Sequence, residues 1–109
     1  MDGEKHTSIL FKATDPIGTD VVLPVKTWDH IKKRHPEIKK VNKIKETIQK
    51  PDFVILNDIR NTTTYTTTSS LRLFFNVHAT MHEDGNYVAT AYLTKDIPEG
   101  DCIWQRQKK

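Results

Sequence analysis

The stretch Leu71-Arg72-Leu73-Phe74-Phe75-Asn76-Val77-His78, followed after a turn by Tyr87-Val88-Ala89-Thr90-Ala91-Tyr92-Leu93-Thr94, decides the fold. Every second residue of each segment is apolar, which is the period of a β-strand with one buried face. Asp84 and Gly85 between the segments are typical turn residues. The two segments therefore predict an antiparallel hairpin.

The turn of this hairpin sets which side chains share a face. A two-residue turn at Asp84-Gly85 would place Val77 opposite Tyr92 and mix the faces, because a slip of one residue reverses every side chain. A three-residue loop, Glu83-Asp84-Gly85, with Gly85 left-handed and a bulge beside it, separates the faces, so we expect this second register. It pairs Val77 with Ala91 and Phe75 with Leu93 on the apolar face, and His78 with Thr90, Asn76 with Tyr92 and Phe74 with Thr94 on the other.

The remaining segments are read in the same way. Residues 8–12 and 20–25 predict a β-ribbon around a turn at 15–18, and residues 53–56 and 62–68 predict two more strands. Trp28, Ile31 and His35 recur at helical spacing after Thr27, which can cap a helix, and Pro36 ends this pattern. A second helix is expected over residues 40–50, before Pro51.

These elements predict a single α+β domain over residues 1–109. We expect an N-terminal β-ribbon and two helices packed on one face of a twisted four-stranded antiparallel sheet. The other face of the sheet would then be a candidate binding surface.

Composition and charge point to an anionic partner without defining it. The chain has 17 Lys and Arg against 14 Asp and Glu, for a net charge of +3, and residues 26–50 hold nine basic and three acidic residues. The one cysteine, Cys102, cannot form an intrachain disulfide, and neither a signal peptide nor an apolar run of membrane-spanning length is present. We expect a cytoplasmic protein that does not enter a membrane.

The segment Trp28-Asp29-His30-Ile31-Lys32-Lys33-Arg34-His35-Pro36-Glu37 concentrates chemistry at the end of the first helix. Histidine, with an ordinary pKa of about 6.5, transfers protons near neutral pH. Arginine and lysine supply fixed charge for phosphates. A small metal-free nuclease needs this combination.

Together with Ile48-Gln49-Lys50-Pro51-Asp52-Phe53-Val54, Tyr65 and Ala89-Thr90-Ala91-Tyr92-x-Thr94, the pattern His30-x-x-x-Arg34-His35-Pro36-Glu37 carries a resemblance. It resembles the phage-associated branch of the superfamily of barnase, EndoU, colicin and RelE-like ribonucleases, over a core of about residues 26–95. The resemblance implies N-terminal helices followed by a four-stranded antiparallel sheet, and metal-independent RNA cleavage in toxin or phage conflict systems. It also implies a cognate antitoxin or immunity protein as a possible partner. Active-site roles would fall on His35, Thr90 and Tyr92, with His30, Arg34 and Tyr65 as further carry-overs.

The chemistry of such cleavage assigns a role to each candidate. A base deprotonates the 2′-hydroxyl, an acid protonates the leaving 5′-oxygen, and cations stabilise the charged phosphorus centre. We expect His35, with His30, to transfer protons and Thr90 and Tyr92 to donate hydrogen bonds to the phosphate. The residues expected to contact the substrate are Arg34, Lys33, Tyr65, Thr94 and His78, of which His78 is also a reserve acid or base.

Each assignment has a structural alternative. His35 could be a helix-end histidine that interacts with the helix dipole, His30 part of a solvated helix face, and Thr90 and Tyr92 ordinary cross-strand packing. A noncatalytic RNA-binding domain would use the same basic helices and the same sheet face. An antitoxin-type or phage accessory protein would use them to bind another protein. The histidines lack a zinc motif and no phosphate-binding glycine loop occurs, so we expect no metal and no cofactor.

Overall fold

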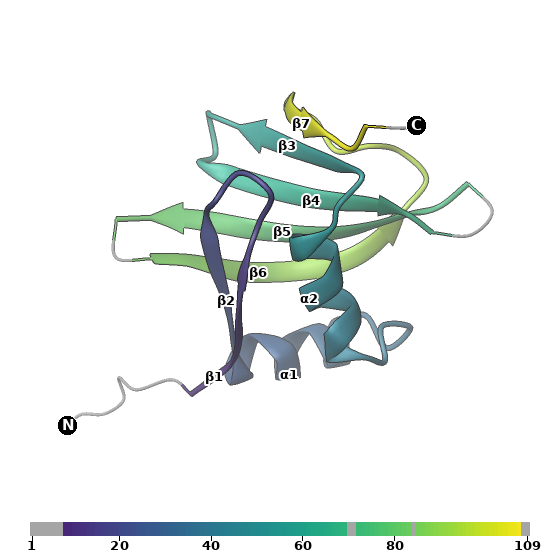
Figure 1. Cartoon of the computed structure of the whole chain (residues 1–109). Helices are drawn as coiled ribbons and strands as arrows, with labels where there is room; N and C mark the ends of the chain where they lie inside the picture. Colours follow the sequence, from purple (N-terminus) through teal and green to yellow (C-terminus); the bar gives the residue numbers. More distant parts are fainter. Residues whose placement is uncertain (1–7, 70–71, 84, 108–109) are drawn as a thin grey trace.

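Seven strands and two helices form in the part of the chain that the computed structural model describes, residues 8–69, 72–83 and 85–107 (Figure 1). In chain order they are β1 (Ile9–Thr14), β2 (Asp20–Pro24), α1 (Val25–Arg34), α2 (Val41–Gln49), β3 (Phe53–Asn57), β4 (Thr62–Thr68), β5 (Phe74–His82), β6 (Gly85–Thr94) and β7 (Asp101–Gln105). Neither described helix is long and apolar enough to cross a membrane.

All seven strands belong to one sheet, in the order β1-β2-β6-β5-β4-β3-β7. The β2–β6 pair is parallel and joins at Val22 and Tyr87, whereas every other pair is antiparallel. The prediction of a four-stranded antiparallel sheet is therefore wrong. The N-terminal ribbon joins the sheet as β1 and β2 instead of standing apart, and β7 adds a strand at the opposite edge.

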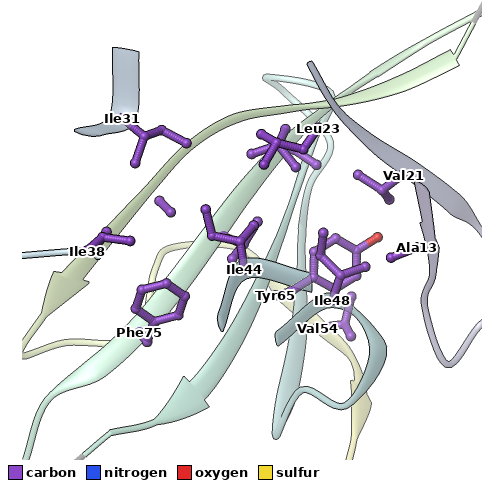
Figure 2. Packing of buried hydrophobic residues seen from close by; sticks show 14 residues of the cluster. Ala13, Val21, Leu23, Ile31, Ile38, Ile44, Ile48, Val54, Tyr65 and Phe75 are labelled. Carbon is purple, nitrogen blue, oxygen red and sulfur yellow. The ribbon is translucent and has the colours of Figure 1, made fainter. Parts of the chain in front are cut away.

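The β1–β2 hairpin, which pairs with β6 only at Val22 and Tyr87, lies with the two helices over one face of the central strands. In Figure 1 the hairpin crosses in front of the central strands, α2 lies beside it, and α1 runs along the side of β6. Figure 2 shows the resulting core, in which Ile31, Ile44 and Ile48 of the helices and Leu23 of the hairpin meet Tyr65 of the sheet. Each large apolar side chain buried in this way stabilises the fold by roughly 1.5–3 kcal/mol.

The β5–β6 register has the predicted pairs. Val77 lies opposite Ala91, His78 opposite Thr90 and Asn76 opposite Tyr92. The bulge, however, lies at Ala89, because His78 pairs with Thr90 and Ala79 with Val88; the ladder then continues to the pair His82–Gly85. The expected bulge beside Gly85 is wrong, and Asp84 of the expected loop lies outside the described residues.

The first helix begins earlier than the sequence indicated. Strand β2 ends at Pro24, which is the N-cap residue of α1, and no side chain caps the helix, so the cap predicted at Thr27 is wrong. The end of α1 agrees with the prediction, because the His35 backbone N–H donates to the Ile31 carbonyl and Pro36 follows. His35 is thus fixed at the end of the helix.

Strand β7 was not predicted. It pairs with β3, and Trp104 of β7 packs against the core from this edge. The segment that leads into β7 passes close to the Leu56 backbone at Gly100, which has a φ of +136°. A Cβ at this position would lie 2.5 Å from the Leu56 carbonyl oxygen. Pairing with β7 also covers the β3 edge, which would otherwise offer free backbone groups.

Candidate active site at the end of α1

His35 contacts the sheet at Tyr92. The ring centroids of the two residues are 6.2 Å apart, with the planes inclined by 36°. The His35 side chain is 31% exposed, and its Nδ1 lies 3.6 Å from Oε2 of Glu37. This arrangement follows from the apolar stripe of α1, which buries Ile31 and turns the helix end toward β6.

Tyr92 belongs to the sheet face turned away from the core, which we call the polar face. Its members are the side chains that alternate with the core residues of the central strands: Thr64, Thr66, Asn76, His78, Thr90, Tyr92 and Thr94. Thr66 Oγ1 donates to Asn76 Oδ1 at 2.8 Å, and Asn76 Nδ2 donates to Thr94 Oγ1 at 2.8 Å. Thr94 in turn donates to the Asp96 carbonyl oxygen at 2.7 Å. These bonds fix the three central strands beside Tyr92.

His78 is the second histidine of the polar face. It is half-buried and lies opposite Thr90, and its Nδ1 is 2.9 Å from Thr64 Oγ1. Burial, and then the positive charge of Arg60, lower the pKa of His78 below its usual 6.5. The neutral imidazole, which can accept a proton, is therefore favoured near neutral pH.

Tyr92 and Thr90 each lie beside one of the two histidines, Tyr92 beside His35 and Thr90 opposite His78. Both side chains are partly exposed, and Thr90 lies two residues before Tyr92 on the same strand. Burial raises the pKa of Tyr92, so its phenol stays protonated and able to donate a hydrogen bond. The polar face thus combines a proton acceptor, two hydroxyls and the imidazole of His35.

Tyr65 is not part of the polar face, whose Thr66 and Asn76 are also fully buried but whose Thr90 and Tyr92 are partly exposed. The Tyr65 side chain is fully buried in the core (Figure 2). Its hydroxyl donates to Asp15 Oδ2 at 2.6 Å. Burial and the hydrogen bond to Asp15 raise the pKa of Tyr65 far above its usual range. The ring therefore has no accessible face on which an RNA base could stack, in contrast to the role expected from the sequence.

The basic residues of α1 lie beside His35. Lys33 and Arg34 are exposed in its last turn, and neither forms an ion pair within the described ranges. Lys32 instead lies 3.6 Å from Asp29 and over the Trp28 ring. His30 is exposed on the helix surface one turn before Arg34, and no contact with Tyr92 or Thr90 is found for it, so its catalytic role stays a prediction.

Glu37 and Thr64 contact the two histidines, and sequence reasoning gave neither of them a role. Glu37 lies only two residues after His35, so its contact with the imidazole could have been predicted from the sequence. Thr64 meets His78 only through the β4–β5 register, which no local pattern sets within the threonine-rich strand. A second histidine–tyrosine pair, His82 and Tyr87, lies at the other end of the hairpin with ring centroids 5.8 Å apart.

Among the side chains that the structure describes, no three His, Cys, Asp or Glu residues gather closely enough to hold a metal ion. Comparisons of the chain with protein-family models, curated proteins and solved structures found no match.

Proposed function

We propose that this chain is a metal-independent endoribonuclease of the toxin or phage-conflict type, related to the barnase, EndoU, colicin and RelE-like ribonucleases. The observation that carries the proposal is the contact between His35 and Tyr92, beside a face that also holds His78 and Thr90. The seven-stranded sheet departs from the four-stranded fold that the resemblance implied, so the support comes from the side chains and not from the fold. The enzyme would act on single-stranded or loop RNA in a cytoplasm.

The proposed reaction divides proton transfer between the two histidines. Neutral His78 takes the proton of the 2′-hydroxyl, whose oxygen then attacks phosphorus. Protonated His35, paired with Glu37, gives its proton to the 5′-oxygen as the bond between phosphorus and that oxygen breaks. The products are a 2′,3′-cyclic phosphate and a free 5′-hydroxyl.

Tyr92 and Thr90 are the residues that would donate hydrogen bonds to the bound phosphate. Tyr92 touches His35 and is the diagonal neighbour of His78 across the β5–β6 ladder, and such neighbours are about 7–8 Å apart. A phosphate lying over Tyr92 would therefore be near both imidazoles. The Tyr92 and Thr90 hydroxyls donate hydrogen bonds to its oxygens, and Arg34 and Lys33 neutralise its charge.

The experiment is an RNA cleavage assay in EDTA with a matched control. Labelled single-stranded RNA is incubated with the wild type, with His35→Gln and with His82→Gln. The last variant removes the histidine of a similar histidine–tyrosine pair at the far end of the hairpin. Loss of a general acid lowers rates by about 10²–10⁴-fold, so we expect that loss for His35→Gln and wild-type rates for His82→Gln. Intact RNA with the wild type across many sequences would contradict the proposal.

A noncatalytic RNA-binding domain is the second candidate, favoured by the partly exposed Tyr92 beside exposed Lys33 and Arg34. Such a domain would bind RNA without cutting it, and His35→Gln would then retain the affinity of the wild type. If the chain is an enzyme of the toxin type, we propose that a cognate antitoxin or immunity protein covers this same surface.

A further inference from the structure

A cavity of about 340 Å³ lies beside the proposed active site, where the α1–α2 connection meets β5 and β6. Glu37, Lys39, Lys40, Lys43, Phe75 and Leu93 are among the residues that line it. It meets the active site through Glu37, which lies beside His35. Leu93 follows Tyr92 in β6, but its side chain lies on the opposite, core side of the sheet.

The rim of this cavity is positively charged. Three lysines face a single acid, Glu37, and the first turn of α2 contains no acidic residue that could pair with them. Lys39, Lys40 and Lys43 form no ion pair among the residues described, so their charge is available to an anion. This excess of ammonium groups fits a phosphate.

The interior of the cavity is apolar. Phe75 and Leu93 are cross-strand partners on the core side of the sheet; Phe75 lines the cavity as an almost fully buried ring, whereas Leu93 is partly exposed. The Lys43 ammonium lies 5.6 Å from the centre of the Phe75 ring. A flat apolar group bound there would pack against Leu93 and the small exposed part of Phe75 while an attached anion reached the lysines.

We propose that this cavity binds one nucleotide of the RNA substrate, with the base against Phe75 and Leu93 and the phosphate among Lys39, Lys40 and Lys43. This assignment rests on the proposed function, because it makes the cavity the subsite next to the phosphate that His35 and Tyr92 act on. Nucleotide binding in the cavity would hold the strand in register and give the enzyme a base preference at one position.

The test is an NMR titration of the wild-type protein with adenosine 5′-monophosphate. We expect saturable shifts at Phe75 and Leu93, with weaker binding of ribose 5-phosphate, of inorganic phosphate and of adenosine. In Lys39→Gln/Lys40→Gln we expect the dissociation constant of the nucleotide to rise about tenfold or more. The control Lys26→Gln/Lys50→Gln removes the same charge at exposed positions outside the cavity and should change the constant less than about twofold.

The outcomes separate this inference from the ribonuclease proposal. RNA cleavage without nucleotide-dependent shifts at Phe75 and Leu93 would overturn the cavity assignment alone. Saturable shifts without cleavage of any RNA would support the cavity as a nucleotide site and overturn the catalytic proposal. The assignment would also be overturned if the two double variants weakened nucleotide binding equally, or if inorganic phosphate bound as tightly as the nucleotide. Either result would show that binding depends only on the overall positive charge.

Discussion

Asp15 and Tyr65 show how one buried hydrogen bond connects distant parts of this chain. Asp15 Oδ1 accepts from the backbone N–H groups of Ile17 and Thr19, and Oδ2 accepts from the Tyr65 hydroxyl. The carboxylate is almost fully buried, and the three bonds fasten the β1–β2 turn to β4. A buried carboxylate is tolerated when its oxygens accept hydrogen bonds, whereas removal of one donor leaves an oxygen unsatisfied and lowers the stability of the fold.

Tyr65→Phe tests this structural role directly. The substitution keeps the ring in the core but leaves Asp15 Oδ2 without its donor, so we expect the free energy of unfolding to fall by about 1.5–3 kcal/mol. Urea denaturation measures the loss. Because Tyr65 lies away from the polar face, RNA cleavage per folded molecule should stay at the wild-type rate, and a stable variant with lost cleavage would restore Tyr65 to the site.

His78 makes stability depend on pH in a defined direction. Its pKa in the folded protein lies below the unfolded value of 6.5, so between these two values the unfolded chain binds more protons. Stability from this group is complete above pH 6.5 and falls as the pH drops through the folded pKa. We expect urea denaturation to show a smaller loss on acidification for His78→Gln than for the wild type. Identical pH profiles would contradict the assigned shift.

The secondary structure was largely predictable, because local signals set it. Pro36 and Pro51 mark where the helices end, and the alternation in β5 and β6 is strong enough to give the correct pairs. The position of the bulge at Ala89 was not predictable, since alanine carries no preference for a bulge. Strand β7 was missed because its sequence, Asp101-Cys102-Ile103-Trp104-Gln105, is short and lacks a clean alternation, and its pairing with β3 is set by tertiary contacts.

In the candidate site too, features set by local patterns were predictable and features set by tertiary contacts were not. The stripe of α1 and the β6 pattern allowed a contact between His35 and Tyr92 to be expected, because both depend on local periodicity. The burial of Tyr65 could not be read from its strand, because its partner Asp15 is 50 residues away in a turn. Local patterns therefore indicated the face of the sheet but not which polar residues of the fold are structural.

A pair of glycine substitutions tests how β7 is held. Gly18 and Gly100 both have positive φ, at +98° and +136°, but a Cβ on Gly18 meets no atom within 4 Å, whereas one on Gly100 meets the Leu56 backbone. We expect Gly18→Ala to lower the free energy of unfolding by about 1–2 kcal/mol through backbone strain alone. Gly100→Ala should lose more and expose Trp104, which a red shift in tryptophan fluorescence detects. Equal losses would show that the close approach at Leu56 does not secure β7.

The two sides of the sheet have different roles in the molecule as a whole. The hairpin and helices bury one side, and the polar face beside the end of α1 carries the groups suited to proton transfer. Basic residues concentrate around this end and the adjoining cavity, within a net charge of +3. Anionic substrates would therefore be attracted to one region of the surface.

This charge distribution predicts a salt-dependent affinity for RNA. With an oligonucleotide made uncleavable by 2′-deoxy substitution, the logarithm of the binding constant should fall linearly with the logarithm of the salt concentration. Lys33→Gln and Arg34→Gln should each reduce the slope by about 1, because each loses one phosphate contact. Lys26→Gln, at the other end of α1, is the control and should keep the wild-type slope. A slope unchanged in all three variants would remove α1 from the RNA-binding surface.

The most direct test of cleavage by the 2′-hydroxyl is an end-group analysis of two matched oligonucleotides. One is all RNA, and the other carries a single 2′-deoxy residue on the 5′ side of the cleaved bond. In EDTA the wild type should convert the first into fragments with 2′,3′-cyclic phosphate and 5′-hydroxyl ends and leave that bond of the second intact. Cleavage of the deoxy bond, or 5′-phosphate ends, would contradict the account.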